Sequence, residues 1–289
     1  MTAIASAPPA ATAGTLAVKR FPWVSGGIMA VFVLCGVLGP GIAPHDPDRL
    51  DLSKSLLPPV FAGGQWAYPL GTDQLGRDIL SRLLAGAQVS FLVGAGAVVL
   101  AGAIGLVVAL VAGYAGGRLD TVLTRIADSS MAFPVVLLAI VLVAIYGQSI
   151  AMVVLVLVLA VWPQYARVLR SEVLRAKGQD FVTMSAVMGA GRRWIVTRHV
   201  LPNLVPTLLV LATLQLGFAI IAEGSLSFLG IGVPPPAASW GSMLADGRSY
   251  LSTAWWLPLL PGLALSITVL AANLLGDRLR ELFDPATRR

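Results

Sequence analysis

The chain has little charge. Only 12% of its 289 residues are Asp, Glu, Lys or Arg, and 57% are hydrophobic. A soluble domain carries roughly 25% charged residues. This composition excludes an ordinary soluble domain and predicts an integral membrane protein.

Cysteine and histidine are also scarce. The single cysteine, Cys35, excludes a disulfide framework within the chain and is expected to be a small packing residue in a helix. The two histidines, His45 and His199, are too far apart in the predicted topology to form a metal pair. No nucleophile–base or zinc-ligand spacing is present, and the phosphate-loop pattern G-x-x-x-x-G-K-[ST] is missing. We therefore expect no catalytic residue, no metal and no bound cofactor in this chain.

Long apolar runs are abundant, and a spanning helix needs about 20 apolar residues. One of these runs, 129–166, is too long for one span and divides at the turn-like Tyr146-Gly147-Gln148-Ser149. Glycine and alanine repeats at 94–117 permit close helix contact. The sequence predicts an all-α protein with six transmembrane helices, at about 22–43, 88–115, 131–146, 149–166, 204–224 and 256–276.

Lysine and arginine set the orientation, because cytoplasmic loops are enriched in them. With the N-terminus inside, the inner segments hold fifteen of these residues and the outer segments five. Both termini are therefore predicted to be cytoplasmic. The net charge of +6 then reflects topology, and no basic run is dense enough to indicate nucleic-acid binding.

The predicted topology divides the chain into four parts. An Ala/Pro/Thr/Ser-rich start, 1–21, reads as a disordered cytoplasmic tail, and Lys19-Arg20 precedes a retained first helix rather than a cleaved signal. Residues 22–87 hold the first helix and an extracytoplasmic segment, 88–277 a five-helix transmembrane domain, and 278–289 a cytoplasmic tail.

The cytoplasmic loop 167–203 is unusually long and patterned for so apolar a chain. Phe181 to Met188 can form two helical turns, which Gly189-Ala190-Gly191 ends. A second short helix is expected over 192–200, and Pro202 suits the first turn of the next span. Phe181, Met184 and Met188 share one face, so we expect this short helix to lie on another protein.

The same loop resembles the "EAA" loop of ABC importer permeases, which has the form EAA-x3-G-x9-I-x-LP. Gly189, Leu201 and Pro202 match this form. Thr183-Met184-Ser185 stands in place of Glu-Ala-Ala, and His199 stands at the Ile position, as in the His-x-Leu-Pro-Asn ending of peptide permeases.

Three other segments carry a closer resemblance. The stretch 71–90 is similar to GTDxxGRDxxSRxxxGxRxS, a signature of the C-type permease of dipeptide, oligopeptide and nickel systems, with Gln88 in place of the usual Arg. The stretches 223–241 and 275–285 resemble the fifth-helix exit and the C-terminal end of that family.

This resemblance implies the type I ABC importer transmembrane fold in a bacterial cytoplasmic membrane, and a permease that imports di- or oligopeptides by alternating access. The implied partners are a second homologous (B-type) permease, two ATPase subunits that bind ATP and Mg, an extracytoplasmic solute-binding protein and membrane lipid. The residues implied to couple to an ATPase are Asp180, Phe181, Val182, Thr183, Met184, Ser185, Ala186, Met188, Gly189, Ala190 and Pro202.

Two candidate sites at the outer side each have two alternative interpretations. Glu223 is expected near the outer interface, where it either lines the translocation path or gate or makes a structural hydrogen bond. The outer signature residues suggest a short amphipathic helix that is either an ion-paired solvated face or a docking surface for the binding protein or partner permease. They are Gly71, Asp73, Gly76, Arg77, Asp78 and Arg82.

The substrate and the class of protein have alternatives. Nickel chelates, heme and opines are carried by the same permease type. A membrane-embedded enzyme requires clustered polar residues within the spans, and a secondary transporter predicts repeats and broken, charged helices. The sequence shows neither pattern, so both classes are disfavoured.

Overall fold

The computed structural model describes residues 22–283 and shows a bundle of long helices. The long helices are α2 (Pro22–Ile42), α3 (Ile79–Ala115), α6 (Ile150–Lys177), α9 (Leu201–Phe228) and α11 (Trp256–Phe283). The shorter helices are α4 (Gly117–Met131), α5 (Val135–Tyr146), α7 (Asp180–Val187), α8 (Arg192–Ile195) and α10 (Trp240–Gly247). Single turns η1 (Leu52–Lys54), η2 (Val60–Ala62) and η4 (Arg248–Tyr250) lie in the connections, and η3 (Val196–Val200) is a π-helical segment.

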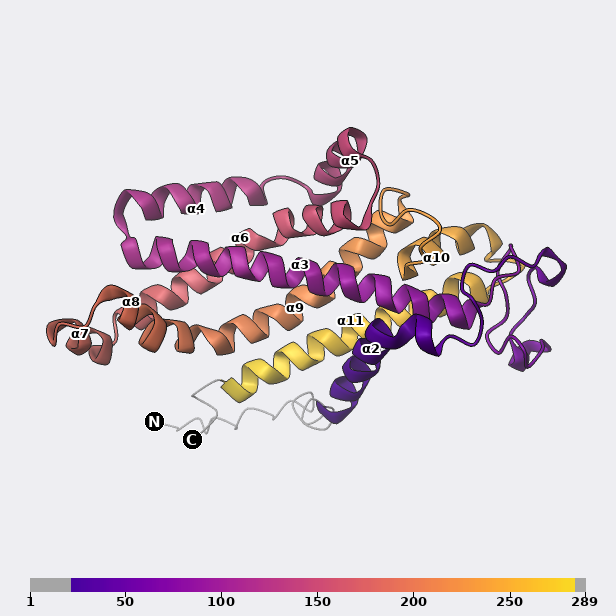
Figure 1. Cartoon of the computed structure of the whole chain (residues 1–289), viewed down its shortest axis with the longest axis horizontal. Helices are drawn as coiled ribbons and strands as arrows, with labels where there is room; N and C mark the ends of the chain where they lie inside the picture. Colours follow the sequence, from indigo (N-terminus) through magenta and orange to yellow (C-terminus); the bar gives the residue numbers. More distant parts are fainter. Residues whose placement is uncertain (1–21, 284–289) are drawn as a thin grey trace, which may run out of the picture.

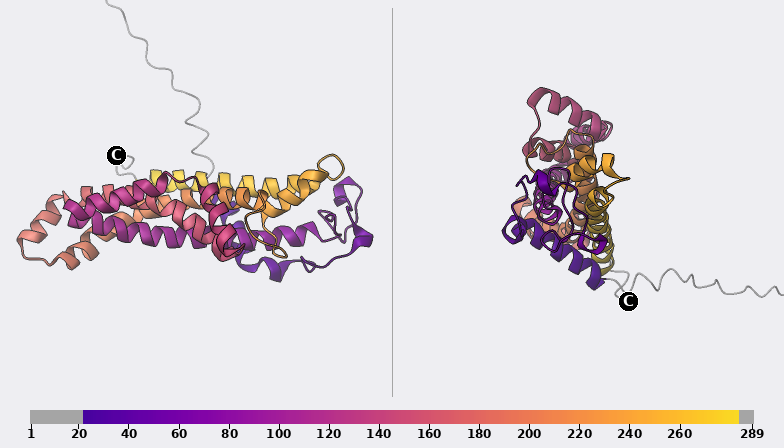
Figure 2. Two further views of the ribbon diagram at one scale, coloured as in Figure 1. Left: turned by 90° about the horizontal axis from the view of Figure 1, so that it is seen from above. Right: turned by 90° about the vertical axis from the view of Figure 1, so that its right-hand side faces the viewer.

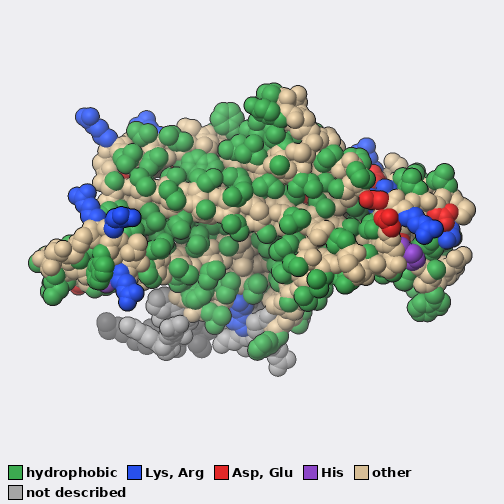
Figure 3. All heavy atoms as spheres, viewed as in Figure 1, with side chains coloured by type: hydrophobic (Ala, Val, Ile, Leu, Met, Phe, Trp, Pro, Cys, Tyr) green, Lys and Arg blue, Asp and Glu red, His purple; other side chains and the backbone are tan. Residues whose placement is uncertain are grey.

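The molecule is elongated, and its two ends differ (Figures 1 and 2). The helices α7 and α8 form one end, and the segment between α2 and α3 forms the other. Hydrophobic side chains cover the middle of the face in Figure 3, while Lys and Arg gather at the α7–α8 end and charges of both signs at the opposite end. This distribution agrees with the predicted orientation, since α2 begins and α11 ends toward the α7–α8 end (Figure 1).

Five of the six predicted spans are present as long apolar helices within the described residues. The sixth, predicted at about 131–146, is present as α5, whose 12 residues are too short to cross a membrane alone. A sixth span results only if α5 is counted together with α4, from which it is bent by 85°. Pro134 has no N–H to donate and disfavours helical backbone at Phe133, so α4 ends at Met131 and a new helix begins at Val135.

Most other helices extend beyond their apolar runs. The helix α3 begins nine residues before the predicted start at 88, α6 continues to Lys177, and α11 continues to Phe283 into the predicted C-terminal tail. Apolar length measures only the part of a helix that lies in lipid, and the backbone hydrogen bonds continue into water. The predicted tail 1–21 and residues 284–289 lie outside the described residues.

The continuous helical stretch that contains α9 begins at Arg192, nine residues before α9 itself. Residues Arg192–Phe228 form one helical stretch of 37 residues, about 55 Å long. Pro202 and Pro206 each remove a backbone donor, and the π-helical register of η3 precedes them. The side-chain amide of Asn203 donates to the His199 carbonyl at 2.8 Å and supplies a partner there. The second short helix predicted over 192–200 is therefore the start of the span itself.

The bundle core depends on close contact between α3 and α6. A Cβ atom added to Gly105 would lie 2.3 Å from Tyr165 Cβ and 2.9 Å from the Ala166 nitrogen, and one added to Gly113 would lie 2.7 Å from Val173 Cγ1. The small residues therefore let the two backbones approach, as the repeats at 94–117 predicted.

We predict that Gly105→Ala lowers the thermal stability of the purified protein in detergent. Its methyl group meets side chain and backbone that cannot move apart, which costs about 1–3 kcal/mol. The matched control is Gly96→Ala on the same helix, where the added Cβ would lie 3.8 Å from Val154 Cγ1. Equal unfolding temperatures for the two variants would contradict this packing account.

Candidate functional site

The outer end of the molecule holds a network of buried charges. Asp73 accepts hydrogen bonds from the backbone nitrogens of Leu75 and Arg77, both at 2.9 Å, and from Arg77 Nε at 2.6 Å. The second guanidinium, that of Arg82, lies 3.6 Å from the same carboxylate. The buried carboxylate of Asp73 thus fixes the turn at residues 73–77 and offsets the positive charges of Arg77 and Arg82.

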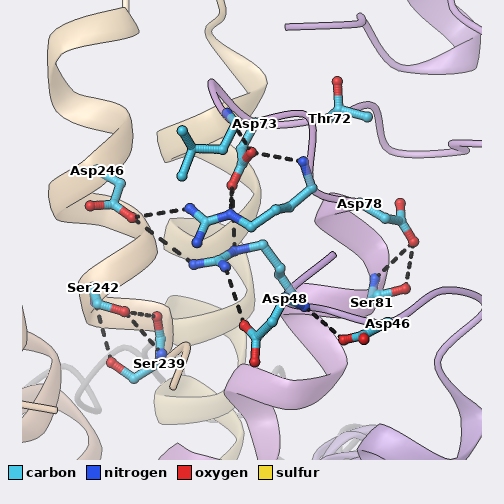
Figure 4. A network of polar contacts seen from close by, with 12 residues as sticks. Asp46, Asp48, Thr72, Asp73, Asp78, Ser81, Ser239, Ser242 and Asp246 are labelled. Atoms are coloured by element: carbon cyan, nitrogen blue, oxygen red, sulfur yellow. Dashed lines mark hydrogen bonds and ion pairs between the residues drawn. The ribbon is translucent and has the colours of Figure 1, made fainter. Parts of the chain in front are cut away.

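Other carboxylates complete this network (Figure 4). Asp246 on α10 lies 3.9 Å from Arg77 Nη2 and 4.0 Å from Arg82 Nη2, and Asp48 lies 4.0 Å from Arg82 Nη1. Burial raises the pKa of Asp246 above its ordinary value, while both arginines lower it. The network ties α10 to the segment before α3 and to the first turn of α3.

Asp78 begins α3. Its side chain accepts from the Ser81 backbone nitrogen at 3.2 Å and from the Ser81 hydroxyl at 2.6 Å, as an N-cap residue does. The His45 ring lies 3.2 Å away, and the His45 backbone nitrogen donates to Ser81 Oγ. The chain that follows α2 is therefore fastened to the start of α3.

The two signature glycines allow close backbone contact within this segment. A Cβ on Gly71 would lie 2.4 Å from the Leu57 carbonyl oxygen, and one on Gly76 would lie 1.8 Å from that of Asp51. Both glycines also have positive φ, which favours glycine. The residues of the outer signature thus hold the segment 45–78 in a compact fold at the start of α3. We call this segment, together with α10, the outer cap.

These positions correct two sequence predictions. Asp73 and Arg77 precede the helix, so the outer signature does not form a short amphipathic helix. Asp73, Asp78 and Arg82 are buried, so they do not form a solvated ion-paired face either. The ion pairing was correct, but it lies inside the folded cap.

Glu223 on α9 is fully buried, with 0% exposure. Its two carboxylate oxygens accept from Ser227 Oγ at 2.7 Å and from Ser90 Oγ at 3.1 Å. Ser90 lies on α3, and the next residue on α9, Gly224, packs against Gly241 of α10. Glu223 therefore ties α9 to α3 near the outer end, and these contacts support its structural role more than a role in the path.

The opposite end of the molecule presents α7. This helix covers Asp180–Val187, one residue earlier than the predicted 181–188. Val182 is buried against the bundle core, whereas Phe181, Met184, Val187 and Met188 are exposed, Met188 by 87%. The result is an apolar face at an end of the molecule where Lys and Arg gather (Figure 3).

Gly189 ends α7 in a left-handed conformation, with φ of 88°. The Gly189 nitrogen donates to the Ala186 carbonyl and the Ala190 nitrogen donates to the Ser185 carbonyl, both at 3.0 Å. These two bonds form a Schellman motif, in which glycine is the favoured residue. The remaining predicted contact residues, Asp180, Thr183 and Ala186, lie on α7, and Pro202 lies at the start of α9.

Sequence reasoning missed the polar contacts of α4. Arg170 on α6 donates to both oxygens of Asp120 at 2.5 and 2.6 Å, and Arg167 donates to Asp128 at 2.5 Å. The segment between the spans predicted at 88–115 and 131–146 was given no structure, although Asp120 and Asp128 recur in it among apolar residues, as on an amphipathic helix. Among residues 22–283, no three His, Cys, Asp or Glu side chains are grouped to hold a metal ion.

We predict that Glu223→Ala destabilises the purified protein, because it leaves buried serine hydroxyls without their acceptor. Each unpaired buried group costs about 1–3 kcal/mol. The control is Ser225→Ala on the same helix, since the Ser225 hydroxyl is exposed and donates only to the Ile221 carbonyl. Thermal unfolding in detergent measures both, and equal melting of the two variants would refute the structural role of Glu223.

Comparison with known proteins gives a consistent family. Residues 105–289 match the model of the binding-protein-dependent transport system inner membrane component, and residues 16–59 match the N-terminal TM domain of oligopeptide transport permease C. The di/tripeptide transport system permease protein DppC of Pseudomonas aeruginosa is 41% identical over 258 residues, which cover 89% of this chain and 85% of the relative. The dipeptide transport system permease protein DppC of Haemophilus influenzae is 40% identical, covering 90% and 88%.

A solved structure supports the fold. The inward-facing MetNI methionine ABC transporter matches with a TM-score of 0.55 at 19% identity, covering 71% of this chain and 96% of the other. The predicted type I ABC importer transmembrane fold is therefore confirmed. The chain belongs to the family of binding-protein-dependent transport system inner membrane components, and it is a multi-pass protein of the bacterial inner membrane.

Proposed function

We propose that this chain forms half of the translocation path of an ATP-driven importer of di- or oligopeptides. The observation that carries this proposal is the identity of about 40% to peptide permeases across nearly the whole chain. The D,D-dipeptide transport system permease protein DdpC of Escherichia coli, 37% identical over 258 residues, extends the same substrate class.

The other half of the path is a second permease, as membership of this family implies. Part of the apolar surface that covers the middle of the face in Figure 3 is then buried against that partner. Membrane lipid covers the remainder. A solute-binding protein delivers the peptide to the outer end, where the cap formed by 45–78 and α10 stands. ATP and magnesium bind to two separate ATPase subunits, consistent with the missing phosphate-loop pattern in this sequence.

The apolar face of α7 is the surface for one ATPase. A freely solvated loop gains nothing from exposing Phe181, Met184, Val187 and Met188 side by side. A groove on a partner protein removes that surface from water, as in other helix-in-groove complexes. ATP binding closes the ATPase pair and moves α7 with it.

The bundle then converts this motion into alternating access. The stretch Arg192–Phe228 runs from the α7 end past Glu223, which accepts a hydrogen bond from α3, and Gly224, which packs against Gly241 of α10. A displacement at the cytoplasmic end thus reaches the outer cap through one helix. Peptide passes when the inner and outer ends open in turn.

Uptake by the reconstituted transporter tests the proposal. Proteoliposomes that hold both permeases and both ATPases, with the binding protein outside and ATP inside, are expected to accumulate labelled di- or tripeptide. Accumulation of a labelled nickel chelate, heme or opine without any peptide would overturn the substrate class and leave the permease assignment intact.

We further predict that Phe181→Glu and Met184→Glu abolish both co-purification of the ATPases and peptide uptake, because a buried unpaired carboxylate opposes docking. The control is Thr197→Glu, which adds the same charge to an exposed position on η3. If both α7 variants retain ATPase and uptake, α7 is not the coupling helix.

A further inference from the structure

We propose that His199 is a positioning residue that clamps α7 to the start of α9, so that the docking face and the spanning helix move as one body. This inference rests on the proposed coupling function of α7. It identifies the contact of His199 with α7 as the one that transmits movement of α7 to α9.

Such a clamp is required because glycine lies on both sides of α7. Gly178 precedes it and Gly189-Ala190-Gly191 follows it, so the covalent connections allow the short helix to swing. We infer that a displacement of α7 is transmitted to α9 mainly through side-chain contacts between the two helices. On the α7 side, Val182 is buried against the bundle, but one valine does not fix the orientation of a helix.

The His199 ring makes contacts to both sides of this joint. Its centroid lies 5.5 Å from that of Phe181 on α7 and 4.9 Å from that of Trp194 on α8. The ring with Trp194 is arranged edge to face, the favourable geometry for two aromatic groups. His199 itself belongs to η3, two residues before α9 begins at Leu201, and its carbonyl accepts from the Asn203 amide at 2.8 Å.

A hydrogen bond also crosses the joint, and its direction follows from proton count. The Ser185 hydroxyl has one hydrogen and donates it to the Phe181 carbonyl at 2.7 Å. Ser185 Oγ can therefore only accept from His199 Nε2, which lies 3.3 Å away. In this pairing the imidazole carries its hydrogen on Nε2, and an aromatic ring without a donor reproduces the stacking but not this bond.

The sequence gives this pair independent support. Ser185 and His199 are two of the four positions at which the loop departs from the pattern EAA-x3-G-x9-I-x-LP, and the structure brings them into contact. The alanine and isoleucine of that pattern form no hydrogen bond between side chains. This loop has exchanged an apolar pair for a directional polar one.

The test measures coupling in the reconstituted transporter as ATP hydrolysed per peptide taken up. We expect His199→Ala and Ser185→Ala to raise this ratio roughly three- to tenfold, the effect of one lost hydrogen bond, while the ATPases still co-purify. His199→Phe retains the ring and is expected to match Ser185→Ala. The double variant Ser185→Ala/His199→Phe is expected to add nothing further, because both changes remove one bond. The control is Arg198→Ala, an exposed neighbour on η3.

A second readout does not depend on the substrate. A spin label at position 186, on α7 but outside the docking face, in a Cys35→Ala background, is expected to become more mobile in His199→Ala and Ser185→Ala than in Arg198→Ala. An unchanged ratio and unchanged label mobility in both test variants would overturn the clamp. If the unaltered transporter takes up no peptide but the label shows this difference, the substrate proposal fails and the clamp stands. Should His199→Ala fail to assemble, Ser185→Ala alone decides by the same measurements.

Discussion

The bilayer offers no hydrogen-bond partner to a peptide group, and the rest of this structure depends on that constraint. Backbone donors within apolar segments therefore pair inside helices, and long helices make up most of the described residues 22–283, with one break between α4 and α5. Pro202 and Pro206 interrupt this pairing only near the start of α9, where Pro202 stands in the first turn and the π-helical segment η3 precedes it. One uninterrupted helix therefore connects the cytoplasmic loop with the outer cap.

Polar side chains then appear where helices must be held in a fixed relation. At the outer end, Glu223 accepts from hydroxyl groups of α3 and α9, and Asp73 pairs with Arg77 and Arg82. At the inner end, arginines of α6 bind aspartates of α4. Between the ends, glycine and alanine on α3 admit α6 without polar contacts. The bundle is therefore held by charge at both ends and by close packing in the middle.

The sequence predicted those features that follow from composition along one helix. The length of the apolar runs predicted the five long spans, arginine and lysine predicted the orientation, and Gly189 predicted the end of α7. Apolar length did not predict α4, because a helix at the membrane edge is amphipathic and its apolar runs are short. The burial of Asp73 and Arg82 was not predicted either. It requires the ion pairs of Arg82 with Asp48 and Asp246, which come from distant parts of the chain. The contact between Ser185 and His199 likewise exists only after Gly189 has reversed the chain.

The central claim is that α7 and the membrane-spanning α9 move together. Distances between spin labels at positions 186 and 205 of the assembled transporter, with Cys35 replaced by alanine, test it most directly. Both sites are exposed, one on α7 outside the docking face and one in the first turns of α9. We expect the same distance distribution without nucleotide and with bound ATP, while a 186–118 pair, which joins α7 to α4, changes. A 186–205 distance that shifts on ATP binding would contradict the joint movement of α7 and α9.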